Sequence, residues 1–150
     1  MSEDAPPSAP PIVLDTNVVV SAVLAVSPSS PPVRVLRAVR NGLFRMVLSD
    51  ALFAEYRDAL YRPHLVRRHQ LSAEELEVIL WALSETARWV QVVADVETPP
   101  DANDVHVWAT CIASPEAMLI TGDADLLAFA RGRATALTPR EFVTAHLPPS

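Results

Sequence analysis

Short apolar runs alternate along the chain with longer segments in which apolar residues recur every three or four positions. Runs that are apolar throughout and only a few residues long are typical of strands buried on both faces of a parallel sheet. Most of these runs stop abruptly at polar, glycine or proline residues, as strands do at their ends. We predict strands at residues 12–14, 44–48, 90–93, 117–120 and 134–137.

The segments between these strands carry helix signals. Ser49, Ser72 and Thr138 are placed to cap helices, and Ser72-Ala-Glu-Glu75 has the sequence of a capping box. Residues 27–32, Ser-Pro-Ser-Ser-Pro-Pro, are predicted to form a loop because proline does not continue a helix. We predict helices at residues 18–26, 33–40, 50–61, 72–87, 103–113 and 125–131, and a last one after Thr138.

Strands that alternate with helices predict an α/β fold in three layers, α/β/α. A short central parallel sheet of four to five strands would lie between two layers of helices, as in Rossmann-like folds. The chain of 150 residues has room for one domain, which we place at residues 12–146. The proline-rich residues 1–11 are predicted to be a disordered tail, and residues 147–150 a C-terminal tail.

The composition indicates in which cellular compartment this domain works and which partners it meets. Cys111 is the only cysteine, so one chain forms neither a disulfide nor a thiolate metal cluster, as suits a reducing cytoplasm. We find no secretory signal and no run of the roughly 20 apolar residues that span a bilayer. We therefore expect a cytoplasmic protein without a membrane partner. The net charge of −6 does not attract nucleic acid, unless the negative charge is concentrated around cations.

Acidic residues recur where the predicted elements meet. Asp15 and Asp123 follow two apolar strands directly, and the carboxyl ends of parallel strands meet at one edge of a sheet. Glu55 falls in the apolar stripe of its helix, and Asp104 heads the apolar stripe of the helix predicted at residues 103–113. Each residue alone could be a helix cap, a turn residue or the partner of a surface arginine. Their joint placement predicts an acidic cluster, which we call the four acids.

Four carboxylates in one cleft repel each other and require protons or a metal ion to coexist. Oxygen ligands without histidine or cysteine select Mg²⁺ or Mn²⁺ over zinc. One or two such ions can bind a phosphate oxygen, lower the pKa of an attacking water and stabilise the leaving oxygen. The four acids therefore indicate hydrolysis of a phosphodiester.

The sequence resembles PIN-domain nucleases at four points in the family's order. Residues 12–18, Ile-Val-Leu-Asp-Thr-Asn-Val, resemble its first motif, a strand that ends in Asp-Thr-Asn. Glu55 and Asn103-Asp104 resemble the second and third acids, and residues 121–127 resemble the Thr-Gly-Asp-x-Asp-Leu segment. The likeness covers roughly residues 12–146 and is greatest to the VapC-like branch, the toxins of toxin–antitoxin systems.

This resemblance implies a metal-dependent endoribonuclease with an RNA substrate, a homodimer and, for a toxin, an antitoxin protein that blocks the site. It makes the four acids both catalytic and metal-binding, with Asp125 as an accessory ligand. Asn17 and Thr121 would orient Asp15 or a water. We also expect phosphate contacts from arginines, or else a solvated basic face, at Arg34, Arg37, Arg62, Arg67 and Arg68.

Two other functions stay open at this point. A PIN-like module that binds RNA or protein without catalysis would have little reason to keep four mutually repelling acids. A magnesium-dependent phosphatase of another α/β fold usually needs a nucleophilic aspartate with lysine and Ser/Thr nearby. All twelve basic residues are arginine, which counts against the phosphatase.

Overall fold

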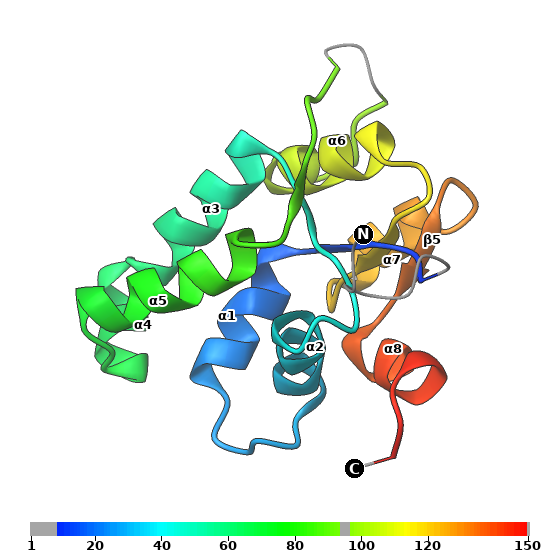
Figure 1. Cartoon of the computed structure of the whole chain (residues 1–150). Coiled ribbons are helices and arrows are strands. Elements are labelled where there is room, and N and C mark those ends of the chain that lie inside the picture. Colours follow the sequence, from blue (N-terminus) through cyan, green and yellow to red (C-terminus); the bar gives the residue numbers. More distant parts are fainter. Residues whose placement is uncertain (1–8, 94–96, 150) are drawn as a thin grey trace.

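Parallel strands cross the centre of the domain and helices cover them on both sides (Figure 1). The computed structural model describes residues 9–93 and 97–149. Of the predicted N-terminal tail, residues 1–8 lie outside this range, as does Ser150 at the other end. The strands are β1 (Ile12–Leu14), β2 (Val47–Leu48), β3 (Arg88–Trp89), β4 (Met118–Ile120) and β5 (Thr135–Leu137).

The strands form two groups joined at one point. Strands β1, β4 and β5 form a three-stranded parallel sheet in the order β1-β4-β5, and β2 pairs in parallel with β3. A single parallel bridge between Ile12 and Met46 connects β1 to the segment that leads into β2. The order across both groups is β3-β2-β1-β4-β5, with its switch point between β1 and β4. The α/β class and the parallel sheet are thus confirmed. The sheet consists of three strands, and the pair β2-β3 is linked to it by the single bridge.

Helices connect successive strands. They are α1 (Thr16–Leu24), α2 (Pro31–Arg40), α3 (Asp50–Leu60), α4 (Pro63–His69), α5 (Ala73–Ser84), α6 (Val105–Ala113), α7 (Ala124–Ala130) and α8 (Pro139–His146), with a 3₁₀ turn at Ala102–Asp104 before α6. The three predicted caps are confirmed. The Ser49 hydroxyl accepts the Leu52 N–H, and Ser72 and Thr138 each form a complete capping box.

Three local predictions were wrong. Helix α2 begins at Pro31 and not after the prolines. Proline is tolerated in the first turn because the first N–H groups of a helix have no intrahelical partner, so its missing N–H costs no hydrogen bond. No helix was predicted for the basic segment Pro63–His69, which forms α4 and buries Leu65. Strand β3 lies at Arg88–Trp89, ahead of the predicted 90–93, because its position is decided by pairing with β2.

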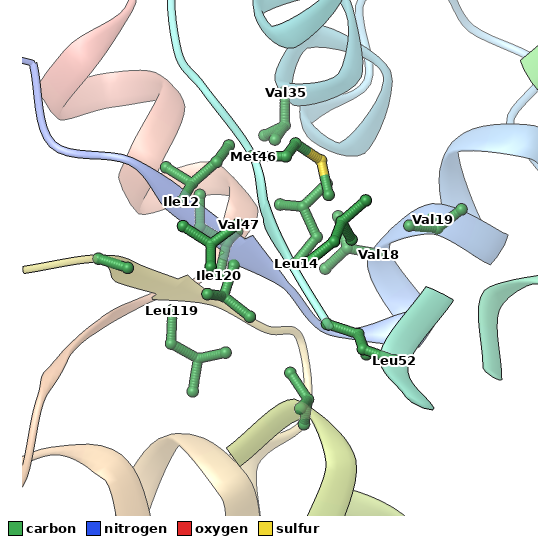
Figure 2. Packing of buried hydrophobic residues seen from close by; sticks show 14 of the residues in the cluster. Ile12, Leu14, Val18, Val19, Val35, Met46, Val47, Leu52, Leu119 and Ile120 are labelled. Atoms are coloured by element: carbon green, nitrogen blue, oxygen red, sulfur yellow. The ribbon is translucent and has the colours of Figure 1, made fainter. Parts of the chain in front are cut away.

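The central strands of the sheet are buried on both faces, as the uniformly apolar runs predicted, whereas the edge strands β3 and β5 are partly exposed. All residues of β1 and β4 are buried. In Figure 2, Leu14 points to the face covered by α1 and α2, whereas Leu119 points towards the opposite face, which α7 covers. Among the described residues, no helix has the length and apolar character needed to cross a membrane.

Tyr56 connects α3 to the end of β1. Its side chain is fully buried, and its hydroxyl donates a hydrogen bond of 2.5 Å to the Leu14 carbonyl. Burial, followed by the charge of Asp15, raises the Tyr56 pKa well above its ordinary value, so the hydroxyl stays a donor. Since Glu55 precedes Tyr56 on α3, this bond holds Glu55 near the residue that follows β1.

We predict that Tyr56→Phe lowers the free energy of unfolding by about 1 kcal/mol, because it leaves the buried Leu14 carbonyl without this donor. Urea denaturation measures the loss. Tyr61→Phe is the matched control, since the Tyr61 hydroxyl bonds Glu77 at the exposed surface and water can replace it. Equal losses in the two variants would contradict the role given to Tyr56.

Candidate active site

Asp15 and Thr121 meet beyond the carboxyl ends of two paired strands. Leu14 of β1 lies opposite Ile120 of β4, so the residues that follow them are neighbours. The Thr121 hydroxyl donates a hydrogen bond of 2.6 Å to Asp15 Oδ2, and it accepts the Asp123 N–H at 3.0 Å. Asp15 is 5% exposed and Thr121 is fully buried. One hydroxyl therefore positions Asp15 and the turn that carries Asp123.

Glu55 is brought to this edge from α3. The Thr16 hydroxyl, in the first turn of α1, donates a hydrogen bond of 2.9 Å to Glu55 Oε2. Sequence reasoning chose Asn17 and Thr121 as the polar partners. Thr121 donates to Asp15, but Asn17 is exposed and makes no hydrogen bond to Asp15 in the described structure. Thr16 was missed although it stands in the same Asp-Thr-Asn motif. The motif alone does not reveal which of its polar residues faces the acids.

Asp104 ends the 3₁₀ turn and heads α6. It is 6% exposed, and its carboxylate accepts no hydrogen bond from any described residue. Burial is the largest of the causes that raise the Asp104 pKa from 3.8 to about 6. The other causes are the charges of nearby acids, which are Asp15, Asp123, Asp101 and Glu55. The structure thus brings the four acids into one electrostatic environment.

Asp15 and Asp123 differ in the hydrogen bonds that their carboxylates accept. Burial raises the Asp15 pKa, and the charges of Asp123 and Glu55 raise it further, against the opposing hydrogen bond from Thr121. Asp123 caps α7, because its Oδ1 accepts the N–H groups of Asp125 and Leu126 at 2.9 and 3.4 Å. The cap that sequence reasoning left open for Asp123 therefore exists, and it uses one of the two carboxylate oxygens.

Arginine does not neutralise the four acids in the described part of the chain. The ion pairs there are Arg57–Glu77, Arg88–Glu116, Arg131–Glu141 and Arg133–Glu97, all at the surface. Glu55 therefore has no arginine partner among the described residues, and the surface-pair alternative for it was wrong.

The five arginines proposed to contact phosphate lie on α2 and on or beside α4. Arg34 and Arg37 donate to backbone carbonyls, of Pro148 at 2.5 Å and of Pro28 at 2.9 Å. Arg62, Arg67 and Arg68 are exposed. Helix α4 packs against α1 and α3, the helices that carry Thr16 and Glu55. A contact between these arginines and RNA stays a prediction.

The donor chemistry of the four acids fits a hard divalent cation, because all of their donors are carboxylate oxygens. Their arrangement does not by itself form a ligand cage: among residues 9–93 and 97–149, no three His, Cys, Asp or Glu side chains are grouped so as to hold a metal ion. Asp125 is exposed and is not among the charges that raise the Asp104 pKa. Its predicted part in metal binding gains no support from its position.

Fold and site together define a small Rossmann-like α/β domain with an acidic centre at the carboxyl edge of its sheet. The sequence profile of the PIN domain family matches residues 11–125, a range that includes all of the four acids, and the chain belongs to this family. PIN domains are generally nucleases. The family predicted from the motifs is confirmed, whereas the match does not assign the chain to the toxin branch. A search of curated proteins gives no match.

We predict that Asp104→Asn stabilises the protein in EDTA at pH 8, because it removes a buried charge that four neighbouring acids repel. The folded-state pKa of about 6 lies above the ordinary 3.8, so the wild type loses stability as pH rises through this interval. The melting temperature should rise by about 3 °C for each kcal/mol relieved. The gain should shrink below pH 6, where Asp104 is protonated.

Melting curves in EDTA between pH 4.5 and 8 measure this effect. Asp58→Asn is the control, since Asp58 is an exposed acid on α3, the helix that also carries Glu55. A stabilisation that is absent, or that does not vary with pH, would contradict the repulsion at Asp104.

Proposed function

We propose that this protein is a metal-dependent endoribonuclease that hydrolyses RNA phosphodiester bonds at the four acids. One observation carries the proposal: hydrogen bonds from Thr121 and Thr16 gather Asp15, Glu55 and the turn that carries Asp123 at the carboxyl edge of the sheet. Asp104 lies close enough for these three charges to raise its pKa. Buried acids that repel one another and lack an arginine partner are costly to the fold, and a bound cation offsets that cost. Membership of a family of nucleases supports the same reaction.

Asp15, Glu55, Asp104 and Asp123 would hold Mg²⁺ or Mn²⁺, as one or two ions. When bound, the cation supplies the positive charge that offsets the phosphate and the oxygen that leaves it. The chain positions the ligands: Thr121 donates to Asp15 and Thr16 donates to Glu55, so neither carboxylate rotates freely. Asp104, with a pKa of about 6, loses its proton near neutral pH and is then ready to accept a cation.

The finer assignments rest on the likeness of the four motifs to the toxin branch. They are RNA as the substrate, the role of a toxin, an antitoxin partner, a homodimer and a cytoplasmic location. The binding-only alternative is less well supported, because it leaves four mutually repelling acids without a purpose. The phosphatase alternative is disfavoured, since the chain has no lysine to accompany a nucleophilic aspartate.

We predict that the wild type cleaves single-stranded or structured RNA in Mn²⁺ and Mg²⁺ but not in EDTA, and that Asp104→Asn does not cleave. Gel analysis of a panel of labelled RNAs provides the measurement, with Asp58→Asn as the control that should cleave normally. Mn²⁺ should also raise the melting temperature of the wild type more than that of Asp104→Asn. Cleavage that persists in EDTA, or in Asp104→Asn, would contradict metal-dependent hydrolysis at the four acids.

We predict that Thr16→Val lowers cleavage about tenfold, because it removes the hydroxyl that positions Glu55. Thr16→Ser keeps the hydroxyl and should restore most of the rate. Single-turnover cleavage in Mn²⁺ compares the two variants, and their melting temperatures in EDTA separate loss of fold from loss of position. Equal rates in Thr16→Val and Thr16→Ser would remove Thr16 from the site.

A further inference from the structure

A cavity of about 700 Å³ opens beside Asp104, between the 3₁₀ turn and α7. Its volume falls within the range of small-molecule sites, roughly 300–1,000 Å³. Its polar side chains are all carboxylates, from Asp101, Asp104 and Asp125, and its apolar wall includes Pro100 and Phe129. The cavity therefore adjoins the proposed reaction centre through Asp104 and extends away from it towards α7.

The lining favours a ligand that donates hydrogen bonds. Arginine and histidine are absent from the described lining, so a phosphate would meet only like charge there. Asp104 is 6% exposed as a residue, its carboxylate accepts no hydrogen bond from the described residues, and it borders the cavity. A planar group with N–H donors on its edge would satisfy the carboxylates and bury its faces against the apolar wall.

Asp125 is the carboxylate best placed to bind such an edge. Asp101 already uses Oδ1 to accept the Asn103 N–H at 2.9 Å. The Asp125 side chain is exposed and makes no hydrogen bond within the described structure, so both of its oxygens can accept. Its backbone N–H is held by Asp123 at 2.9 Å, which fixes the start of α7 and thus the position of Asp125.

Phe129, in the apolar wall, is contacted on two sides by neighbouring side chains. Phe129 meets Trp108 edge to face, with ring centroids 5.2 Å apart, and the Arg133 guanidinium lies 4.2 Å from the centre of the Phe129 ring. Arg133 is itself held by two hydrogen bonds from its guanidinium to Glu97, at 3.0 and 2.8 Å. A flat ligand would therefore meet a preformed surface, and little binding free energy would be spent on ordering the side chains of the wall.

We propose that this cavity binds an unpaired guanine base next to the scissile phosphate, and that Asp125 selects it. The proposal rests on the function proposed above and deepens it. The Watson–Crick edge of guanine presents N1–H and N2–H side by side, so one carboxylate accepts both. Adenine and cytosine pair one amino group with a ring nitrogen that would face the carboxylate lone pairs, and uracil flanks its N–H with carbonyls. The edge is free only in an unpaired base.

The test uses fluorescein-labelled single-stranded RNAs that carry guanosine, inosine, adenosine or uridine at one central position of a uridine background. Binding is measured by anisotropy in Ca²⁺ and cleavage is mapped in Mn²⁺, for the full chain and for Asp125→Asn. We expect the wild type to prefer guanosine over uridine at least fivefold in binding. Inosine, which lacks the N2 amino group, should lose most of that preference.

Asp125→Asn should bring the guanosine-to-uridine ratio close to one, because an amide cannot accept two hydrogen bonds side by side. Asp58→Asn is the matched control and should keep the ratio. Cleavage without preference for guanosine, or a preference that survives in Asp125→Asn, would overturn the guanine site and leave the nuclease intact. Preferential binding without cleavage would support the site and overturn the nuclease. Absence of both binding and cleavage would overturn both.

Discussion

The parallel pairing of β1 with β4 is the interaction on which the site depends. Leu14 lies opposite Ile120, and the Asp15 N–H continues the ladder with a 2.9 Å bond to the Ile120 carbonyl. This register delivers Thr121 to Asp15. A slip of one residue would turn every side chain of the strand to the other face, which burial on both faces of the sheet makes costly. Packing of the apolar core therefore fixes the strand register, and the register places the Thr121 hydroxyl against the Asp15 carboxylate.

That position carries an electrostatic cost. Asp15 and Asp104 are buried beside other acids, and the pKa of each is raised above its ordinary value, first by burial and then by like charge. Hydrogen bonds from Thr16 and Thr121 and the tether of Tyr56 to β1 hold the acids together against this repulsion. Such stored repulsion is typical of sites that bind cations, where stability without the ligand is given up for affinity.

The acidic centre and the cavity share Asp104 but differ in chemistry. In the centre, neighbouring carboxylates raise the pKa of Asp15 and Asp104, which suits a cation and the phosphate that it binds. In the cavity, Asp101 and Asp125 lie beside a fixed apolar wall, which suits the edge and face of a base. The 3₁₀ turn belongs to both, since it ends at Asp104 and is capped by Asp101. One short turn thereby links the proposed chemistry to the proposed choice of nucleotide.

The sequence by itself determined the α/β class, the approximate strands, the caps at Ser49, Ser72 and Thr138, and the family. These features depend on neighbouring residues or on short motifs in order. Only the tertiary structure decided that Thr16 and not Asn17 faces an acid, and where β3 lies. Both depend on elements far apart in the chain: Thr16 bonds a residue 39 positions away and Asp15 one 106 positions away. Local patterns predict which side chains are polar, but packing decides which of them meet.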